Sequence, residues 1–268
     1  MSLSTVFAYN ASLFPVALLP HMPPLFIFVF FLALSCLFLL WYIKRKFKHL
    51  IDMFERESLQ TRQDSQQLEH LIALYKDLDL PGSLPPTRGW AGSPDFLRAV
   101  YEQVRTLKPD RVVECGSGVS TIVITRALEQ NGKGHLWSLD HDAHFAALTA
   151  QRVEGFGLSH RVSMLIAPLH EVGIKGQSSP WYQHQALPEG TLDLVVIDGP
   201  PITEDPRARF AGGPALISRL SAGGAMLLDD ANRPGERAIA DEWRALYPHL
   251  KFEHIGTEKG MLKAVHAV

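Results

Sequence analysis

The sequence predicts an α/β protein, with a doubly wound, mostly parallel sheet that follows a transmembrane helix. Two observations indicate this arrangement. An uncharged apolar run precedes the first charged residue, Lys44, and beyond residue 90 short β-branched runs alternate with helical patterns. Strands and helices that alternate at these lengths are typical of a parallel sheet with helices on both faces.

The composition excludes several other classes of protein. Hydrophobic residues make up 46% of the chain and charged residues 20%, whereas a disordered chain has too little apolar surface to bury. The 26 Lys and Arg against 28 Asp and Glu give a net charge of −2, and nucleic-acid-binding proteins usually carry a strong cationic excess. The cysteines, Cys36 and Cys115, are too few for a disulfide framework or a cysteine-based zinc site.

The apolar run at residues 25–43, LFIFVFFLALSCLFLLWYI, predicts the transmembrane helix. At about 1.5 Å per residue it spans roughly 28 Å, close to the ~30 Å hydrocarbon core of a bilayer. Lys44 and Arg45 begin a cationic segment directly after it, so the positive-inside rule places the carboxy-terminal side in the cytoplasm. A cleaved signal peptide would show the inverse pattern, with cations before the run. We therefore expect a single-pass membrane protein with a cytoplasmic domain.

The segments around this helix are expected to form a tail and a stalk. Residues 1–24 contain several prolines and would form a short outside tail. Residues 44–80 have helical apolar spacing. This spacing favours a juxtamembrane stalk that packs on its own domain over a coiled coil, which would make a homodimer. The Pro- and Gly-rich loop that begins at Pro81 marks the start of the main domain, residues 81–268.

Periodicity within the main domain predicts each element of the sheet. Strands are expected at residues 111–114, 135–139, 162–166, 192–197, 225–228, 252–254 and 261–265. Helices are expected at residues 95–106, 120–130, 143–156, 213–220 and 235–247. Because such sheets bind ligands beyond the carboxyl ends of their strands, the residues at those ends are the candidates for function.

The first predicted strand ends in VVECGSGVST. Gly116 and Gly118 let the backbone turn tightly and approach a ligand, and the helix from Ser120 directs its amino terminus to the same place. Thr121 replaces the third glycine of a dinucleotide fingerprint, and Glu114 would repel a pyrophosphate but attract a cationic amino-acid group. The pattern favours S-adenosylmethionine (SAM) over NAD. A glycine turn with a purely structural Glu114 is the alternative.

The second and third predicted strands end in further ligand candidates. Asp140 lies at the position where an acid can bond both ribose hydroxyls of an adenosine ligand. Its alternative role is to cap the following helix, which Asp142 would fill equally well. Ala167 and Pro168 follow the third strand and would flank an adenine, although packing alone also explains them.

The glycine loop, Asp140 and the fourth-strand sequence LDLVVIDGPP together resemble class I SAM-dependent methyltransferases over about residues 90–268. Three further segments are similar to sequences of a bacterial group within that superfamily, namely RGWAGSPDF, DDANRPGER and TEKG. The resemblance implies a seven-stranded Rossmann-like methyltransferase sheet and a set of cofactor contacts. The expected contacts with SAM are Trp90, Ser93, Glu114, Gly116, Ser117, Gly118, Ser120, Asp140, His141, Ala167 and Pro168.

Three carboxylates at neighbouring strand ends, Asp198, Asp229 and Asp230, bear on the mechanism. They resemble the magnesium ligands of the catechol O-methyltransferase group, with two departures. Asp230 replaces an asparagine, and Pro201 stands where that group has a catalytic lysine. One interpretation is a Mg²⁺ site in which Asp198 and Asp229 are catalytic. The other makes Asp198 a general base or substrate ligand, with Asp229 and Asp230 capping the next helix.

Four other side chains are candidates for binding the methyl acceptor. Trp181 and Tyr182, expected in an irregular stretch between the third and fourth strands, would form an aromatic platform. Arg207 and Arg209 would bind a phosphate or carboxylate, unless they are only surface charges.

The leading hypothesis is a membrane-anchored SAM-dependent methyltransferase that methylates an oxygen of a membrane-associated or small-molecule acceptor. One alternative is a NAD-dependent oxidoreductase, for which we find no third glycine and no catalytic Tyr-Lys pair. The other is a non-catalytic SAM-binding membrane scaffold.

Overall fold

The computed structural model describes residues 23–174, 176–183, 187–201, 203 and 205–267. The chain divides into two compact units, one that ends at Arg62 and one that begins at Gln63. Helix α1 (Pro24–Leu78) contributes residues to both. The predicted outside tail at residues 1–24 falls almost entirely outside the described residues.

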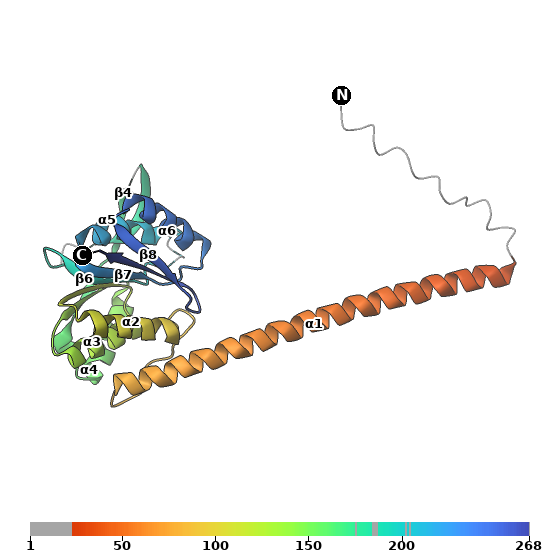
Figure 1. The fold of residues 1–268 in the computed structure, drawn as a ribbon, viewed down its shortest axis with the longest axis horizontal. Helices are drawn as coiled ribbons and strands as arrows, with labels where there is room; N and C mark the ends of the chain where they lie inside the picture. Colours follow the sequence, from red (N-terminus) through yellow and green to blue (C-terminus); the bar gives the residue numbers. More distant parts are fainter. Residues whose placement is uncertain (1–22, 175, 184–186, 202, 204, 268) are drawn as a thin grey trace, which may run out of the picture. The chain divides into compact units, whose positions relative to one another are not determined.

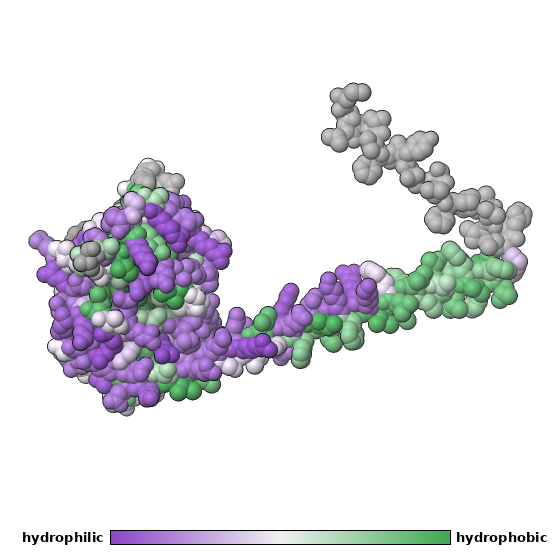
Figure 2. All heavy atoms as spheres, in the orientation of Figure 1, coloured by the Kyte–Doolittle hydropathy of each residue, from purple (hydrophilic) through white to green (hydrophobic). Residues whose placement is uncertain are grey.

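In the first unit, the amino-terminal part of α1 is apolar and its later turns are more polar (Figure 2). The large apolar side chains at residues 25–43 are exposed, an arrangement that is unfavourable in water. Among the described residues, α1 is the helix whose length and composition would allow it to cross a membrane. A signal sequence near the amino terminus would pass the same test, so the membrane span stays a prediction.

The second unit is built on the predicted seven-stranded sheet (Figure 1). Its order is β3-β2-β1-β6-β7-β9-β8; β9 pairs antiparallel with β7 and β8, and the other neighbouring strands pair in parallel. The strands are β1 (Arg111–Cys115), β2 (His135–Asp140), β3 (Val162–Ile166), β6 (Leu192–Ile197), β7 (Leu220–Leu228), β8 (Leu250–Ile255) and β9 (Met261–His266). The central strands β1 and β6 are buried along almost their whole length, because helices cover both faces of a parallel sheet.

The helices form a layer on each side of the sheet, as Figure 1 shows. One layer holds α2 (Pro94–Leu107), α3 (Val119–Asn131) and α4 (Ala143–Gly155), and the other holds α5 (Gly212–Leu216) and α6 (Pro234–Leu246). The predicted helix at residues 213–220 ends early. After Leu216 the chain makes a short 3₁₀ turn and enters β7 at Leu220, before the predicted strand start at residue 225.

The stretch after β3 differs from the prediction. Instead of an irregular connection, β4 (Leu169–Ile174) and β5 (Gln177–Tyr182) form a two-stranded antiparallel sheet. Pro180 and Gly173 within these runs obscure the strand pattern in the sequence, because both residues are unfavourable inside strands. The hairpin places Trp181 and Tyr182 in the core, where both side chains are fully buried.

The end of α1 belongs to the core of the second unit. Leu74 and Leu78 are fully buried in one cluster with Phe96 and Leu97 of α2. Gln67 Nε2 donates a hydrogen bond of 2.8 Å to Asp95 Oδ2. The compact unit therefore begins before the Pro- and Gly-rich loop at residue 81, where the sequence predicts the domain boundary.

Candidate active site

A cleft of about 490 Å³ lies at the carboxyl ends of β1, β2 and β6 and beside the end of β7. This is where a doubly wound sheet is expected to bind its ligand. The residues that line the cleft are Trp90, Gly116, Ser117, Asp140, His141, Asp142, Phe145, Tyr182, Asp198, Gly199, Pro201, Thr203, Arg209, Asp230, Arg233 and Lys259.

The glycine loop, residues 116–118, is the turn that joins β1 to α3. Gly116 has a φ of +94°, and a Cβ there would lie 3.1 Å from the main-chain nitrogen of Gly199. Only glycine fits this conformation and close approach without strain. Gly118 is the N-cap of α3, and a Cβ built on it would meet nothing within 4 Å. The loop therefore leaves open space at the amino terminus of a helix.

Glu114 lies beneath the loop and does not line the cleft. Its side chain is fully buried, and its Oε2 accepts hydrogen bonds from Thr121 Oγ1 at 2.6 Å and Ser138 Oγ at 2.7 Å. Oε1 has no hydrogen-bond partner among the described residues. Burial raises the pKa of this carboxyl from 4.5 to about 7, although the nearby hydroxyl groups of Ser120, Thr121 and Ser138 oppose the rise.

Asp140 lies at the end of β2 and holds the glycine loop. Its Oδ2 accepts hydrogen bonds from the main-chain nitrogen and the hydroxyl of Ser117, and its Oδ1 accepts one of 3.0 Å from the nitrogen of Asp142. The capping role falls to Asp142, whose carboxylate accepts from the nitrogens of His144 and Phe145 at the start of α4. The alternative that Asp140 caps this helix is therefore wrong.

The structure divides the other predicted cofactor contacts into two groups. Trp90, Gly116, Ser117 and His141 line the cleft, whereas Ser93, Ser120 and Ala167 are buried and, like Gly118 and Pro168, are not among its lining residues. Ser93 instead donates a hydrogen bond of 2.6 Å to Asp95 Oδ1 next to α2. Sequence reasoning missed Phe145, Thr203, Arg233 and Lys259, which reach the cleft from segments without a recognisable strand-end signal.

The three acids come together as the strand order predicts. Asp198 follows β6, and Asp229 and Asp230 follow β7, which pairs with β6 in parallel. One carboxylate oxygen from each residue lies within 4.8 Å of the other two. Asp198 and Asp230 line the cleft, whereas Asp229 is fully buried behind it.

Arg209 is the counter-charge of this cluster. Its side chain is only 5% exposed, and its guanidinium lies 2.9 Å from Asp230 Oδ2 and 3.5 Å from Asp198 Oδ1. It also donates to the main-chain oxygens of Asp198 and Asp229. The interpretation of Arg209 as a surface charge is therefore wrong, because a buried guanidinium needs such partners.

The electrostatics of the acids follow from their burial. Burial raises the pKa of Asp198 to about 6, and Arg209 opposes that rise. Burial also raises the pKa of Asp229 well above its usual range, and the nearby Asp198 and Asp230 carboxylates add to the effect. Neither carboxylate oxygen of Asp229, nor Oδ1 of Asp230, has a hydrogen-bond partner among the described residues.

These acids do not cap the helix that follows them. Helix α6 begins at Pro234, with Arg233 at the N-cap position and no hydrogen bond from a side chain to the helix nitrogens. Arg233 Nη1 lies 2.8 Å from Asp230 Oδ2, so Asp230 binds two arginines instead. The capping interpretation of Asp229 and Asp230 is wrong, and their clustering needs another explanation.

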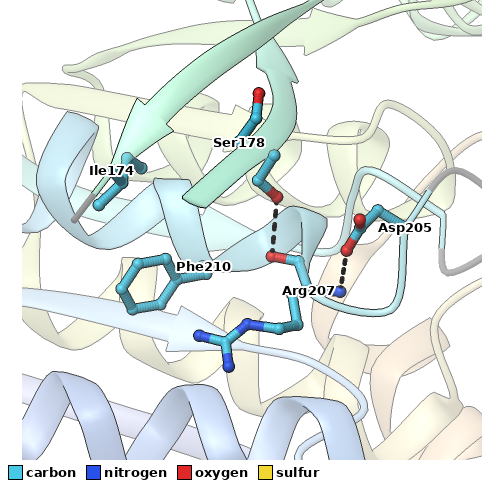
Figure 3. A pocket seen from close by; sticks show the side chains of 6 residues that line it. Ile174, Ser178, Asp205, Arg207 and Phe210 are labelled. Carbon is cyan, nitrogen blue, oxygen red and sulfur yellow. Dashed lines mark hydrogen bonds between the residues drawn. The ribbon is translucent and has the colours of Figure 1, made fainter. Parts of the chain in front are cut away.

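The predicted aromatic acceptor platform does not form. Trp181 is buried in the core, and only Tyr182 borders the cleft. Arg207 lies at a second, smaller cavity of about 380 Å³ between β5 and the segment from Asp205 to Phe210 (Figure 3). Its guanidinium lies 5.2 Å from the centre of the Phe210 ring and pairs with Glu242 at 2.6 Å. The guanidinium of Arg207 therefore already has partners within the domain, Glu242 and Phe210.

The chain resembles known proteins in sequence and in fold. Residues 113–231 match the family model described as a methyltransferase domain. The O-methyltransferase from Bacillus cereus in complex with SAH is 18% identical, with a TM-score of 0.52 over 75% of this chain and 90% of that one. Cofactor-bound Rv0187 from MTB is also 18% identical, with a TM-score of 0.52 over 74% of this chain and 89% of that one. At this identity the likeness shows a common fold.

The sequence matches none of the curated proteins with which it was compared.

Proposed function

We propose that the chain is a membrane-anchored enzyme of the class I methyltransferase superfamily that methylates an oxygen atom with SAM as donor, supported by the match to a methyltransferase domain and by the shared fold. The main support for the proposal is that one cleft contains both a predicted cofactor site and a cluster of acids. The glycine loop with Asp140 forms one wall, and the acids after β6 and β7 form the other.

The residues of the first wall fit SAM. The open space beside Gly118 and the amino terminus of α3 would accept the methionine carboxylate. Asp140 would bind the ribose, and Trp90 would cover the ligand. Glu114, whose buried Oε1 has no hydrogen-bond partner among the described residues, would lie behind the loop for the methionine amino group, and that positive charge would favour its ionised form. SAM, when bound, supplies a methyl group on a positively charged sulfur.

The residues of the second wall would orient and deprotonate the acceptor. Methyl transfer needs an oxygen in line with the methyl group, so fixing the acceptor and removing its proton carry most of the rate enhancement. Asp198 and Asp230 line the cleft, where they would accept a hydrogen bond or a proton from an acceptor hydroxyl.

Asp198, Asp229 and Asp230 also fit a hard divalent cation such as Mg²⁺. Three of their oxygens have no hydrogen-bond partner among the described residues, while Arg209 and Arg233 bind the remaining Oδ2 of Asp230. Carboxylate oxygens are the ligands that Mg²⁺ prefers, and no cysteine lies in the cluster to favour zinc. A cation there would bind the acceptor oxygen and lower its pKa, which would remove the need for a lysine at Pro201.

The apolar part of α1 would hold the enzyme at the cytoplasmic face of a membrane. The support is the exposed apolar surface at residues 25–43 and the cations that follow it. A site tethered to a bilayer suits a lipid-linked or otherwise membrane-associated acceptor. Protease added outside intact spheroplasts should leave the domain intact, and cleavage of the domain would invert the proposed topology.

Isothermal titration of the full chain in detergent with SAM and with NAD tests the cofactor. We expect the chain to bind SAM and not NAD. If it binds NAD and not SAM, the oxidoreductase alternative is supported. Transfer of a labelled methyl group from SAM into membrane extracts then tests activity. SAM binding without transfer into any extract would support the non-catalytic scaffold.

A further inference from the structure

Among the described residues of the second unit, Trp90 is the most exposed large apolar one, and it lines the cleft. Its side chain is 79% exposed, so packing of the indole on the domain does not fix its position. The position depends on the backbone of residues 88–92, here called the Trp90 turn. In this turn the nitrogen of Arg88 donates to the oxygen of Gly92, and the nitrogen of Ala91 donates to the oxygen of Arg88.

The loop between β8 and β9 binds the backbone of the Trp90 turn. Lys259 Nζ donates hydrogen bonds of 2.8 Å to the oxygen of Gly89 and 3.0 Å to the oxygen of Ala91, the main-chain oxygens of the two residues that flank Trp90. The same Nζ lies 3.9 Å from Asp230 Oδ1 in the acidic cluster. Lys259 therefore links the turn that carries Trp90 to the wall of the cleft that holds the acids.

The adjacent residue strengthens this link. Glu258 forms an ion pair of 2.8 Å with Arg88, and Arg88 forms a second ion pair of 2.8 Å with Asp64 of α1. Arg88 has a φ of +71°, which is uncommon for a residue with a side chain and persists where surrounding contacts hold it.

An ammonium group has three donors and no acceptor. The Nζ of Lys259 donates to two carbonyls and faces one carboxylate, so its contacts join the Trp90 turn to the wall of the cleft that holds the acids. We infer that Lys259 is a positioning residue that holds the Trp90 turn against the cofactor cleft. This inference rests on the proposed SAM site and assigns Lys259 no proton transfer.

The test compares the full-length chain with Lys259→Met, Lys259→Arg and Lys251→Met. Lys251 is an exposed lysine on β8 and provides the matched control. Hydrogen exchange of residues 88–92 is measured without ligand, with β1 as an internal reference for global unfolding. SAM affinity is measured by titration.

We expect Lys259→Met to accelerate exchange in the Trp90 turn about tenfold, with exchange in β1 unchanged. We expect it to weaken SAM binding about tenfold, the usual effect of losing hydrogen bonds from a charged group. Lys259→Arg, which can still donate to the carbonyls, should recover part of both effects, and Lys251→Met should show neither.

Unchanged exchange in Lys259→Met would overturn the inference, and so would faster exchange without any loss of SAM affinity. Failure of the wild-type chain to bind SAM would instead overturn the proposed function, and the exchange data would still decide whether Lys259 holds the turn.

Discussion

The carboxylate of Asp140 accepts hydrogen bonds from the glycine loop, and in the proposed complex it would also accept them from the ribose. Its Oδ2 already accepts from Ser117, and its side chain is only 7% exposed at the edge of the cleft. We predict that Asp140→Ala weakens SAM binding by about 1–3 kcal/mol, the usual worth of hydrogen bonds to a charged group, or roughly 5- to 150-fold in affinity.

Titration calorimetry checks this prediction, with Asp241→Ala as the control because Asp241 is exposed on α6 and pairs only with Arg244 among the described residues. An unchanged dissociation constant for Asp140→Ala would leave Asp140 as a structural support of the loop.

Glu114 makes the stability of the ligand-free protein depend on pH. Its pKa is about 7 in the folded chain, compared with an ordinary value of 4.5. Between these pH values the folded state retains a proton that the unfolded chain has lost, so the contribution of Glu114 to stability falls as the pH rises. The burial of the carboxyl group is the physical cause.

We predict that Glu114→Gln becomes progressively more stable relative to the wild type between pH 5 and pH 7.5, by up to about 3 kcal/mol. Denaturant unfolding of both proteins at the two pH values measures this difference. Other titrating groups cancel in the comparison. A constant difference across this range would mean that Glu114 is ionised in the fold at both pH values.

At the scale of elements, the parallel pairing of β6 and β7 decides which acids meet. Asp198 and Asp229 leave adjacent strands at the same edge of the sheet, and Asp229 keeps both oxygens free of hydrogen bonds among the described residues. Buried carboxylates without partners are unfavourable. A bound cation would therefore stabilise the folded state by mass action.

We predict that Mg²⁺ raises the unfolding temperature of the full chain and that Asp229→Asn abolishes this effect. Asp205→Asn, at the second cavity, is the control. Methyl transfer should be lost in EDTA and recovered with added Mg²⁺. Full activity in EDTA would refute the metal site and leave Asp198 as the principal candidate for the general base.

At the scale of the whole molecule, the folded unit extends into α1. Leu74 and Leu78 are fully buried, and Gln67 is bonded to Asp95. Loss of a fully buried leucine side chain costs about 2–5 kcal/mol. We predict that a chain beginning at Gln63 folds and binds SAM like the full-length protein.

A chain beginning at Leu84, at the boundary that the sequence suggests, should be strongly destabilised. Thermal unfolding of both truncated chains measures the difference. Equal stability would show that the end of α1 is an appendage.

The sequence by itself determined the fold class, the seven strands of the main sheet and the acids at their ends. Periodicity is a local property, so β1, β3 and β6 could be placed almost to the residue. The strand-end positions of Asp140 and Asp198 then follow from the rule that parallel strands share an edge. The predicted membrane segment also rests on local signals, because the prediction depends only on length, apolarity and flanking charge.

Only the tertiary structure decided which charges are buried together. Arg209 is far from the acids in the sequence, and nothing in its local pattern shows that it lies 2.9 Å from Asp230 Oδ2. The contact of Lys259 with the Trp90 turn and the packing of Leu74 against α2 likewise join segments distant in the chain. Local spacing fixes helices and strands, but burial and pairing of charges depend on how those elements pack, so they required the folded structure.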